Sequence, residues 1–86
     1  QEAPPFTVAL REMAQISFAK DEHLSARAYL QRYREVARHT PATLWLGVQV
    51  ERRLGDLDTA ASYALTLKSR FPDSDEARRL LRSENE

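Results

Sequence analysis

Cysteine is absent from the 86-residue chain, which excludes disulfide bonds and thiolate metal sites. Glycine and proline are scarce, at two and four residues, and the aromatic side chains are one Trp, three Tyr and three Phe. Net charge is also absent, because 13 Lys and Arg balance 13 Asp and Glu. Since no overall field draws the chain toward polyanions, we predict no nucleic-acid partner.

Long apolar runs are missing as well, since none approaches the ~20 residues that a membrane-spanning helix needs. We therefore predict a soluble segment that does not insert into a membrane by itself. The first five residues contain neither Met nor the charged-then-apolar pattern of a signal peptide. Such a start is expected of a segment that begins inside a longer protein.

The residues that are present favour helices. Ala, Leu, Arg and Glu are common, and together they predict an all-α chain. A hydrophobic content of 42% is enough for one small core. At this length a single core only just offsets the conformational entropy of the chain, so we expect marginal stability.

The chain repeats itself at a shift of 34 residues. The coinciding positions are Ala26 with Ala60, Leu30 with Ala64, Tyr33 with Leu67, Leu10 with Leu44, and Asp21-Glu22 with Gly55-Asp56. In the first helix of each unit the pair Met13-Ala14 matches Leu46-Gly47 better at a shift of 33. The register is therefore firm in the turn and second helix and looser in the first helix.

Each unit reads as a helix, a tight turn and a second helix. The predicted helices lie near 6–20, 24–37, 42–54, 58–70 and 74–84. We predict one repeat domain over 1–86, divided into a first repeat at 6–38, a second at 41–72, and a capping helix with its tail at 73–86.

Capping residues mark several of the boundaries. Thr40 with Pro41 can begin the third helix, and Asp73 with Glu76 three residues later resembles a capping box for the fifth. Gly55 can take the positive φ that a helix C-terminus requires. The fourth helix is predicted to end before Pro72.

Small residues predict where the helices of each hairpin cross. Two helices approach closely where at least one presents Ala or Gly. We expect Ala14 to meet Ala26 in the first hairpin and Gly47 to meet Ala60 in the second.

The spacing of Leu46-Gly47, Gly55-Asp56, Ala60 and Pro72 resembles the tetratricopeptide signature. The first unit is a degenerate copy, with no Gly at its turn and Arg38 at the position of the closing Pro. The resemblance implies a tetratricopeptide-like superhelix fragment, with two helix-turn-helix repeats and a C-terminal capping helix.

Residues 57–74 are similar to the C-terminal part of the type IV pilus biogenesis and stability proteins of the PilF/PilW family, and residues 8–14 and 26–30 resemble its preceding repeat. Members of that family are outer-membrane lipoproteins, pilotins on the periplasmic face that help the pilus secretin to localise and oligomerise. The resemblance implies a non-enzymatic scaffold whose partner is the secretin or another assembly component. The family's lipid-bearing Cys has no counterpart in this chain.

Two other functions remain open. The chain could be a tetratricopeptide fragment of an unrelated cell-envelope assembly or regulatory protein, or a small enzyme. Against the enzyme, His23 and His39 have no second ligand at metal-binding spacing and are expected to be solvated at helix ends. Two separated glycines cannot form a phosphate loop. We therefore predict no catalytic, cofactor or metal site.

In this architecture the first helix of each hairpin lines a concave groove and exposes residues at i, i+4 and i+7. Two such rows are candidates for a protein-binding groove, one of Arg11, Gln15 and Phe18 and the other of Trp45, Gln49 and Arg52. Their mixture suits a peptide-binding surface, because Trp and Arg are frequent hot-spot residues. The alternative is that Phe18 and Trp45 simply belong to the core.

Repeat arrays bury their core by stacking, so a terminal repeat lacks one neighbour. The first helix is expected to leave an apolar edge uncovered. In an isolated fragment this edge predicts self-association or contact with a partner. The polar residues 82–86 are expected to face water and close the other end.

Overall fold

The computed structural model describes residues 5–86, which contain five helices and no strand. The helices are α1 (Pro5–Ala19), α2 (His23–Val36), α3 (Pro41–Leu54), α4 (Leu57–Arg70) and α5 (Asp75–Glu84). The all-α prediction is confirmed, and every predicted helix end lies within one residue of the observed end. Residues 1–4 of the predicted domain lie outside the described residues.

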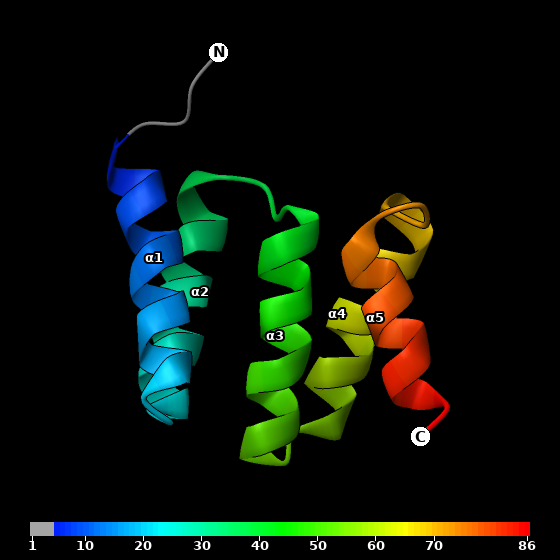
Figure 1. The fold of residues 1–86 in the computed structure, drawn as a ribbon. Coiled ribbons are helices and arrows are strands. Elements are labelled where there is room, and N and C mark those ends of the chain that lie inside the picture. Colours follow the sequence, from blue (N-terminus) through cyan, green and yellow to red (C-terminus); the bar gives the residue numbers. More distant parts are fainter. Residues whose placement is uncertain (1–4) are drawn as a thin grey trace.

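The helices form two layers. Figure 1 shows α1, α3 and α5 side by side in front, with α2 and α4 behind them. α1 packs on α2 and α3 packs on α4, while α2 also contacts α3 and α4 also contacts α5. The principal extents of 36 × 30 × 19 Å describe a slab two helices thick, because a helix with its side chains is about 10 Å across.

The start of α3 has the predicted cap. The Thr40 hydroxyl accepts a hydrogen bond from the Thr43 N–H at 3.2 Å, and the Thr43 hydroxyl accepts one from the Thr40 N–H at 2.8 Å. Pro41 occupies the first turn, where its missing N–H costs nothing. At the other end of α3, Gly55 has the predicted positive φ, 80°. α4 ends at Arg70, before Pro72.

The predicted cap of α5 is wrong by one residue. Ser74, and not Asp73, is the N-cap, because the Ser74 hydroxyl accepts a hydrogen bond from the Ala77 N–H at 3.0 Å. The turn that contains Pro72 places Asp73 one position before the cap, where its carbonyl accepts a hydrogen bond from Arg78.

Two apolar clusters form the core, and α3 contributes to both. The first joins α1, α2 and α3 through Ala14, Ala26, Leu30, Leu46 and Val50. The second joins α3, α4 and α5 through Leu44, Val48, Ala64, Leu67, Ala77 and Leu80. α3 therefore holds the two hairpins and α5 together, because its opposite faces pack into different clusters.

The predicted small residues lie at tight contacts. Ala14 and Ala26 are fully buried in the same cluster, as expected. A Cβ at Gly47 would lie 2.7 Å from the Tyr63 ring, so the Tyr63 side chain, one turn after the predicted Ala60, packs directly against Gly47. Long helical side chains lean toward the N-terminus of their helix, which lets the Tyr63 ring cover the preceding turn, where Ala60 lies.

The outer face of α1 carries the predicted uncovered edge. Phe6, Met13 and Ile16 are 61%, 40% and 48% exposed, and their spacing places them on one side of the helix. At the opposite end of the stack Leu65 and Leu81 are also exposed, so polar residues cover that end only in part. Within residues 5–86, none of the helices is both long and apolar enough to cross a bilayer.

Candidate protein-binding surfaces

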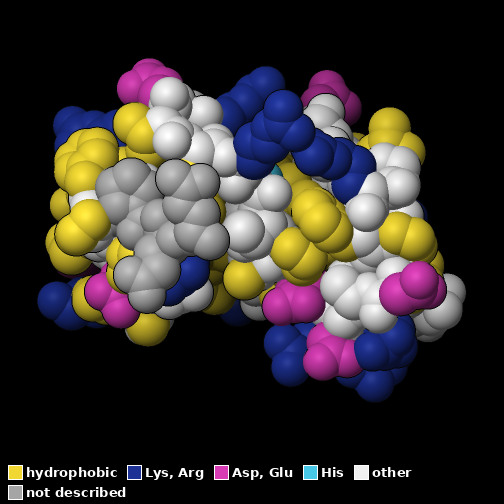
Figure 2. All heavy atoms as spheres, turned by 90° about the horizontal axis from the view of Figure 1, so that it is seen from above, with side chains coloured by type: hydrophobic (Ala, Val, Ile, Leu, Met, Phe, Trp, Pro, Cys, Tyr) yellow, Lys and Arg dark blue, Asp and Glu magenta, His cyan; other side chains and the backbone are white. Residues whose placement is uncertain are grey.

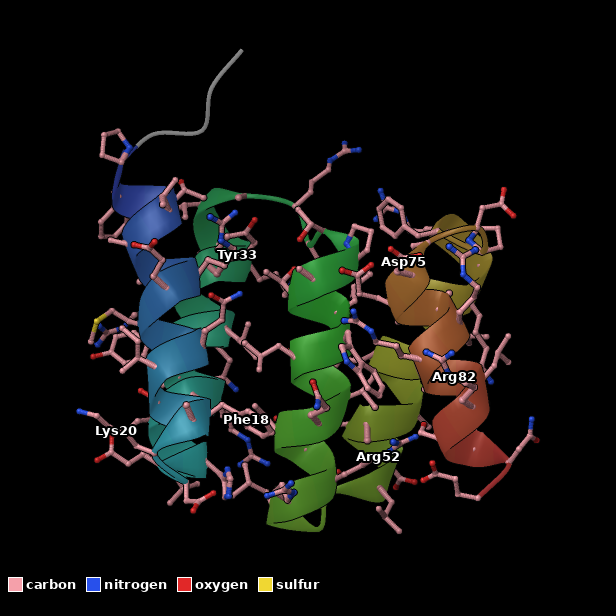
Figure 3. All side chains as sticks on the ribbon, in the orientation of Figure 1. Phe18, Lys20, Tyr33, Arg52, Asp75 and Arg82 are labelled. Carbon is pink, nitrogen blue, oxygen red and sulfur yellow. The ribbon has the colours of Figure 1, made fainter. Side chains whose placement is uncertain are left out.

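The predicted row on α3 lies where α3 meets α5. The Arg52 guanidinium lies 6.0 Å from the centroid of the Trp45 ring, and Arg52 Nη1 donates a hydrogen bond of 3.0 Å to the Ser83 hydroxyl of α5. Trp45 is half-buried against the cluster that joins α3 to α5. Gln49 is half-buried and Arg52 is exposed, so the row presents an amide and a cation beside a partly covered indole. Figure 3 labels Arg52 near the lower part of α5.

The predicted row on α1 has a different setting. Phe18 is half-buried against the cluster that joins the first three helices, and the Arg53 guanidinium of α3 lies 5.5 Å from its ring centroid. Figure 3 shows Phe18 between α1 and α3. Arg11 is half-buried and Gln15 is exposed. The structure thus places the two rows at two successive helix junctions, with an aromatic ring partly inside each junction.

A groove that the sequence did not reveal lies in the other layer, between α2 and α4. Its volume is about 720 Å³, and its floor is formed by α3. The lining residues are Arg27, Gln31, Arg34, His39, Leu44, Glu51, Asp56, Thr59, Ser62, Tyr63, Thr66 and Arg70. We call it the α2/α4 groove. Figure 2, seen from the end where α2 and α4 finish, shows one run of Lys and Arg side chains over the α2/α4 layer and others, mixed with Asp and Glu, on the opposite side.

A partly buried ion pair links the hairpins at one end of this groove. Glu51 of α3 is 2% exposed, and its two carboxylate oxygens accept hydrogen bonds from Arg27 of α2 at 3.1 and 2.5 Å. Because Glu51 is inaccessible to water, it depends on Arg27 for its solvation. The hydrogen bond to Glu51 raises the pKa of Arg27 above its ordinary value, against the opposing effect of burial.

Asp56 extends this pair to α4. Its carboxylate caps α4 by accepting from the Thr59 N–H at 3.1 Å and from the Thr59 hydroxyl at 2.8 Å, and it lies 3.7 Å from Arg27 Nη2. The hydrogen bonds from Thr59, and then the charge of Arg27, lower the pKa of Asp56. Three helices therefore meet in one network, whose members lie 24 and 29 residues from Arg27 in sequence. No local periodicity could have paired them.

His39 lies between two tyrosines at the other end of the groove. Its ring is stacked on Tyr33 with centroids 5.9 Å apart and meets the edge of Tyr63 at 5.4 Å. Nδ1 is 3.0 Å from the Thr43 hydroxyl, whereas Nε2 is buried and has no hydrogen-bond partner. Burial, and then the charge of Arg34, lower the pKa of His39.

The expectation that both histidines are solvated is therefore wrong. His39 is held between helices of different hairpins, and the His23 side chain is 19% exposed beside the Phe18 ring, with centroids 5.6 Å apart. Both are aromatic rings at places where helices meet, which favours packing over exposure. Within the described part of the chain, no three His, Cys, Asp or Glu residues are grouped so as to hold a metal ion.

Comparisons with known proteins place this geometry in context. No family model matches the chain. The type IV pilus assembly protein PilF of Pseudomonas aeruginosa is 37% identical to it over 68 residues, which are 79% of this chain and 27% of that protein. A structure solved for the functional characterization of Pseudomonas aeruginosa PilF superposes with a TM-score of 0.82 at 30% identity, over 90% of this chain and 35% of that one. The chain thus spans about a third or less of the length of these relatives.

Proposed function

We propose, on the premise that the chain is a tetratricopeptide region of the PilF type, that it is a protein-interaction scaffold in type IV pilus assembly. The premise rests on sequence and fold together, at 37% identity and a TM-score of 0.82. In this proposal the protein that carries the chain helps the pilus secretin to localise and oligomerise, at the periplasmic face of the outer membrane.

Binding in place of catalysis is supported by the state of the ionisable groups. Both carboxylates already have hydrogen-bond partners, since Glu51 accepts from Arg27 and Asp56 accepts from Thr59 as the cap of α4, which does not favour the role of a general acid or base. Stacked helices instead offer extended surfaces for another polypeptide. We therefore propose that the chain acts by shape and side-chain complementarity.

We propose the α3 row as the contact surface for the partner. Arg52 is held over Trp45 and bonded to Ser83, so less of its rotamer entropy remains to be lost on binding. Gln49 lies between Trp45 and Arg52 in the sequence and is half-buried. Its amide can form hydrogen bonds with a peptide backbone. The α1 row of Arg11, Gln15 and Phe18 would continue this surface on the preceding helix.

A pull-down of the secretin by the full-length protein tests the proposal. The double variant Trp45→Ala with Arg52→Ala should reduce capture at least tenfold, because aromatic and arginine anchors carry most of the energy of such contacts. Arg79→Ala, an exposed arginine of α5 outside the row, is the control. If the double variant folds, by circular dichroism, and captures as much secretin as the parent, the row does not bind, and these repeats only cap the stack.

A further inference from the structure

The α2/α4 groove is charged unevenly along its length. α2 and α4 both begin near one end, where the single charge of Arg27 faces the carboxylates of Glu51 and Asp56, so that one negative charge is left in excess. At the other end the lining cations are Arg34 and Arg70, and none of the described residues that line the groove there is acidic. Among the described residues, neither arginine takes part in an ion pair. This end therefore lacks the counter-charge that the first end contains.

The middle of the groove presents groups that suit a polypeptide backbone. Gln31 offers an amide, and the hydroxyls of Ser62 and Thr66 donate to carbonyls one turn back on α4, which leaves their oxygen lone pairs free to accept. The volume of about 720 Å³ is in the range of sites that bind a specific ligand. His39 also lines the groove, and its buried Nε2 has no hydrogen-bond partner.

The helix spacing sets the length of the occupant. Arg27 and Arg34 are seven residues apart on α2, about 10 Å, while Asp56 and Arg70 are 14 apart along α4, about 21 Å. An extended chain advances about 3.3 Å per residue. Three to six extended residues therefore reach from the end of the groove that contains Asp56 to the end that contains Arg34 and Arg70.

We propose that the α2/α4 groove binds an extended segment of another protein that carries an acidic residue at one end and a basic residue at the other, with its Glu or Asp side chain between Arg34 and Arg70. The segment's backbone runs over Gln31 and Ser62 toward Asp56, where a basic side chain completes the match. The occupant is a peptide and not a nucleic acid, because Asp56 and Glu51 place negative charge in the same groove. This site is in the layer opposite the α1 and α3 rows and does not depend on the pilus function.

Fluorescence anisotropy with labelled, amidated hexapeptides tests the site on the full chain. The probes carry Lys and Glu at opposite ends with four Ser between them, in both orders, and matched probes have Gln in place of Glu. One order should bind at least tenfold more tightly than its Gln counterpart, as expected for a charge-assisted pair. Equal binding of the two, or no binding at millimolar probe, would overturn the proposal.

Variants locate the binding. Arg34→Gln with Arg70→Gln should weaken the Glu probe at least tenfold, whereas Arg32→Gln with Arg79→Gln, exposed arginines outside the groove, should not. Ser62→Trp should block the groove, and Ala61→Trp, an exposed neighbour on α4, should leave binding unchanged. The proposal is wrong if the two variants of either pair behave alike, or if a single-stranded oligonucleotide displaces the probe as well as excess unlabelled peptide does.

Discussion

The two hairpins have the same architecture but differ in how many neighbours they have. α3 buries seven residues, among them Leu44, Leu46, Val48 and Val50, whereas α1 buries four, of which Thr7 and Ser17 are polar. The reason is position, since α3 lies between α1 and α5 and α1 has a neighbour on one side only. In a repeat array the stability of a unit depends on the interfaces beside it as much as on its own sequence.

The largest effect is expected on the association state, which depends on the uncovered edge of α1. Because Phe6, Met13 and Ile16 expose apolar surface that a neighbour would cover, we expect the chain to self-associate at micromolar concentration. Sedimentation velocity measures this, with Met13→Glu and Ile16→Glu expected to restore the monomer. The substitution Leu24→Glu is the control, because Leu24 is also exposed but lies on α2 and not on the uncovered face of α1. A parent chain that stays monomeric and unfolds cooperatively would contradict self-association through the exposed apolar face of α1.

Equivalent leucines compare the two hairpins directly. Leu10 and Leu44 coincide at the 34-residue shift, but Leu44 is 1% exposed in the cluster that joins α3, α4 and α5, whereas Leu10 is 5% exposed on the terminal helix α1. Leu44→Ala should cost about 4 kcal/mol of unfolding free energy and Leu10→Ala about 2, since the cost grows with the cavity that cannot collapse. Urea titration followed by circular dichroism measures both. An equal or larger cost at Leu10 would contradict the difference between the hairpins.

The link between the hairpins can be broken at Arg27. Arg27→Ala leaves the carboxylate of Glu51 buried without a partner and should cost about 2–3 kcal/mol, less than for a fully enclosed pair because the Arg27 side chain is 31% exposed. Arg27→Met combined with Glu51→Leu removes both charges and should recover most of that loss. Thermal unfolding of the three proteins checks this. If the double variant is as unstable as Arg27→Ala, the attraction between the two charges stabilises the fold, and the loss in Arg27→Ala does not come from leaving Glu51 unpaired.

A smaller effect on stability is expected from exchanging the residue types at the turns inside the two hairpins. Asp21 and Gly55 coincide in the repeat and both have positive φ, 62° and 80°. Since left-handed backbone costs an ordinary residue about 1 kcal/mol, Asp21→Gly should stabilise the chain by up to that amount and Gly55→Asp should destabilise it similarly. Urea midpoints measure the pair. If both substitutions destabilise, the ion contact of Asp21 with Arg53 outweighs the backbone strain.

The sequence predicted the parts of this fold that depend on local chemistry. Helix ends followed from Thr40, Pro41 and Gly55, and the repeat followed from small and apolar positions that coincide at a shift of 34 residues. The sequence could not predict which side chain would cover Gly47, because that depends on how the Tyr63 ring leans across a helix crossing. It likewise missed the α2/α4 groove, whose Arg27–Glu51 pair has no sequence signature.

The smallest expected effect is on the pH dependence of stability, through His39. Burial lowers the pKa of His39 in the folded chain, so the unfolded chain binds this proton more tightly. Stability is therefore fully present above the unfolded pKa of about 6.5 and falls as pH drops below it, because protons then favour unfolding. The charge of Arg34 acts in the same direction, while the carboxylate of Glu51 is already paired with Arg27.

Urea titrations at pH 7.5 and 5.5 should show this loss of stability in the parent and a weaker loss in His39→Phe, whose ring can still lie between Tyr33 and Tyr63. An unchanged slope in His39→Phe would assign the pH dependence to other groups and leave His39 as a packing residue that joins the two hairpins.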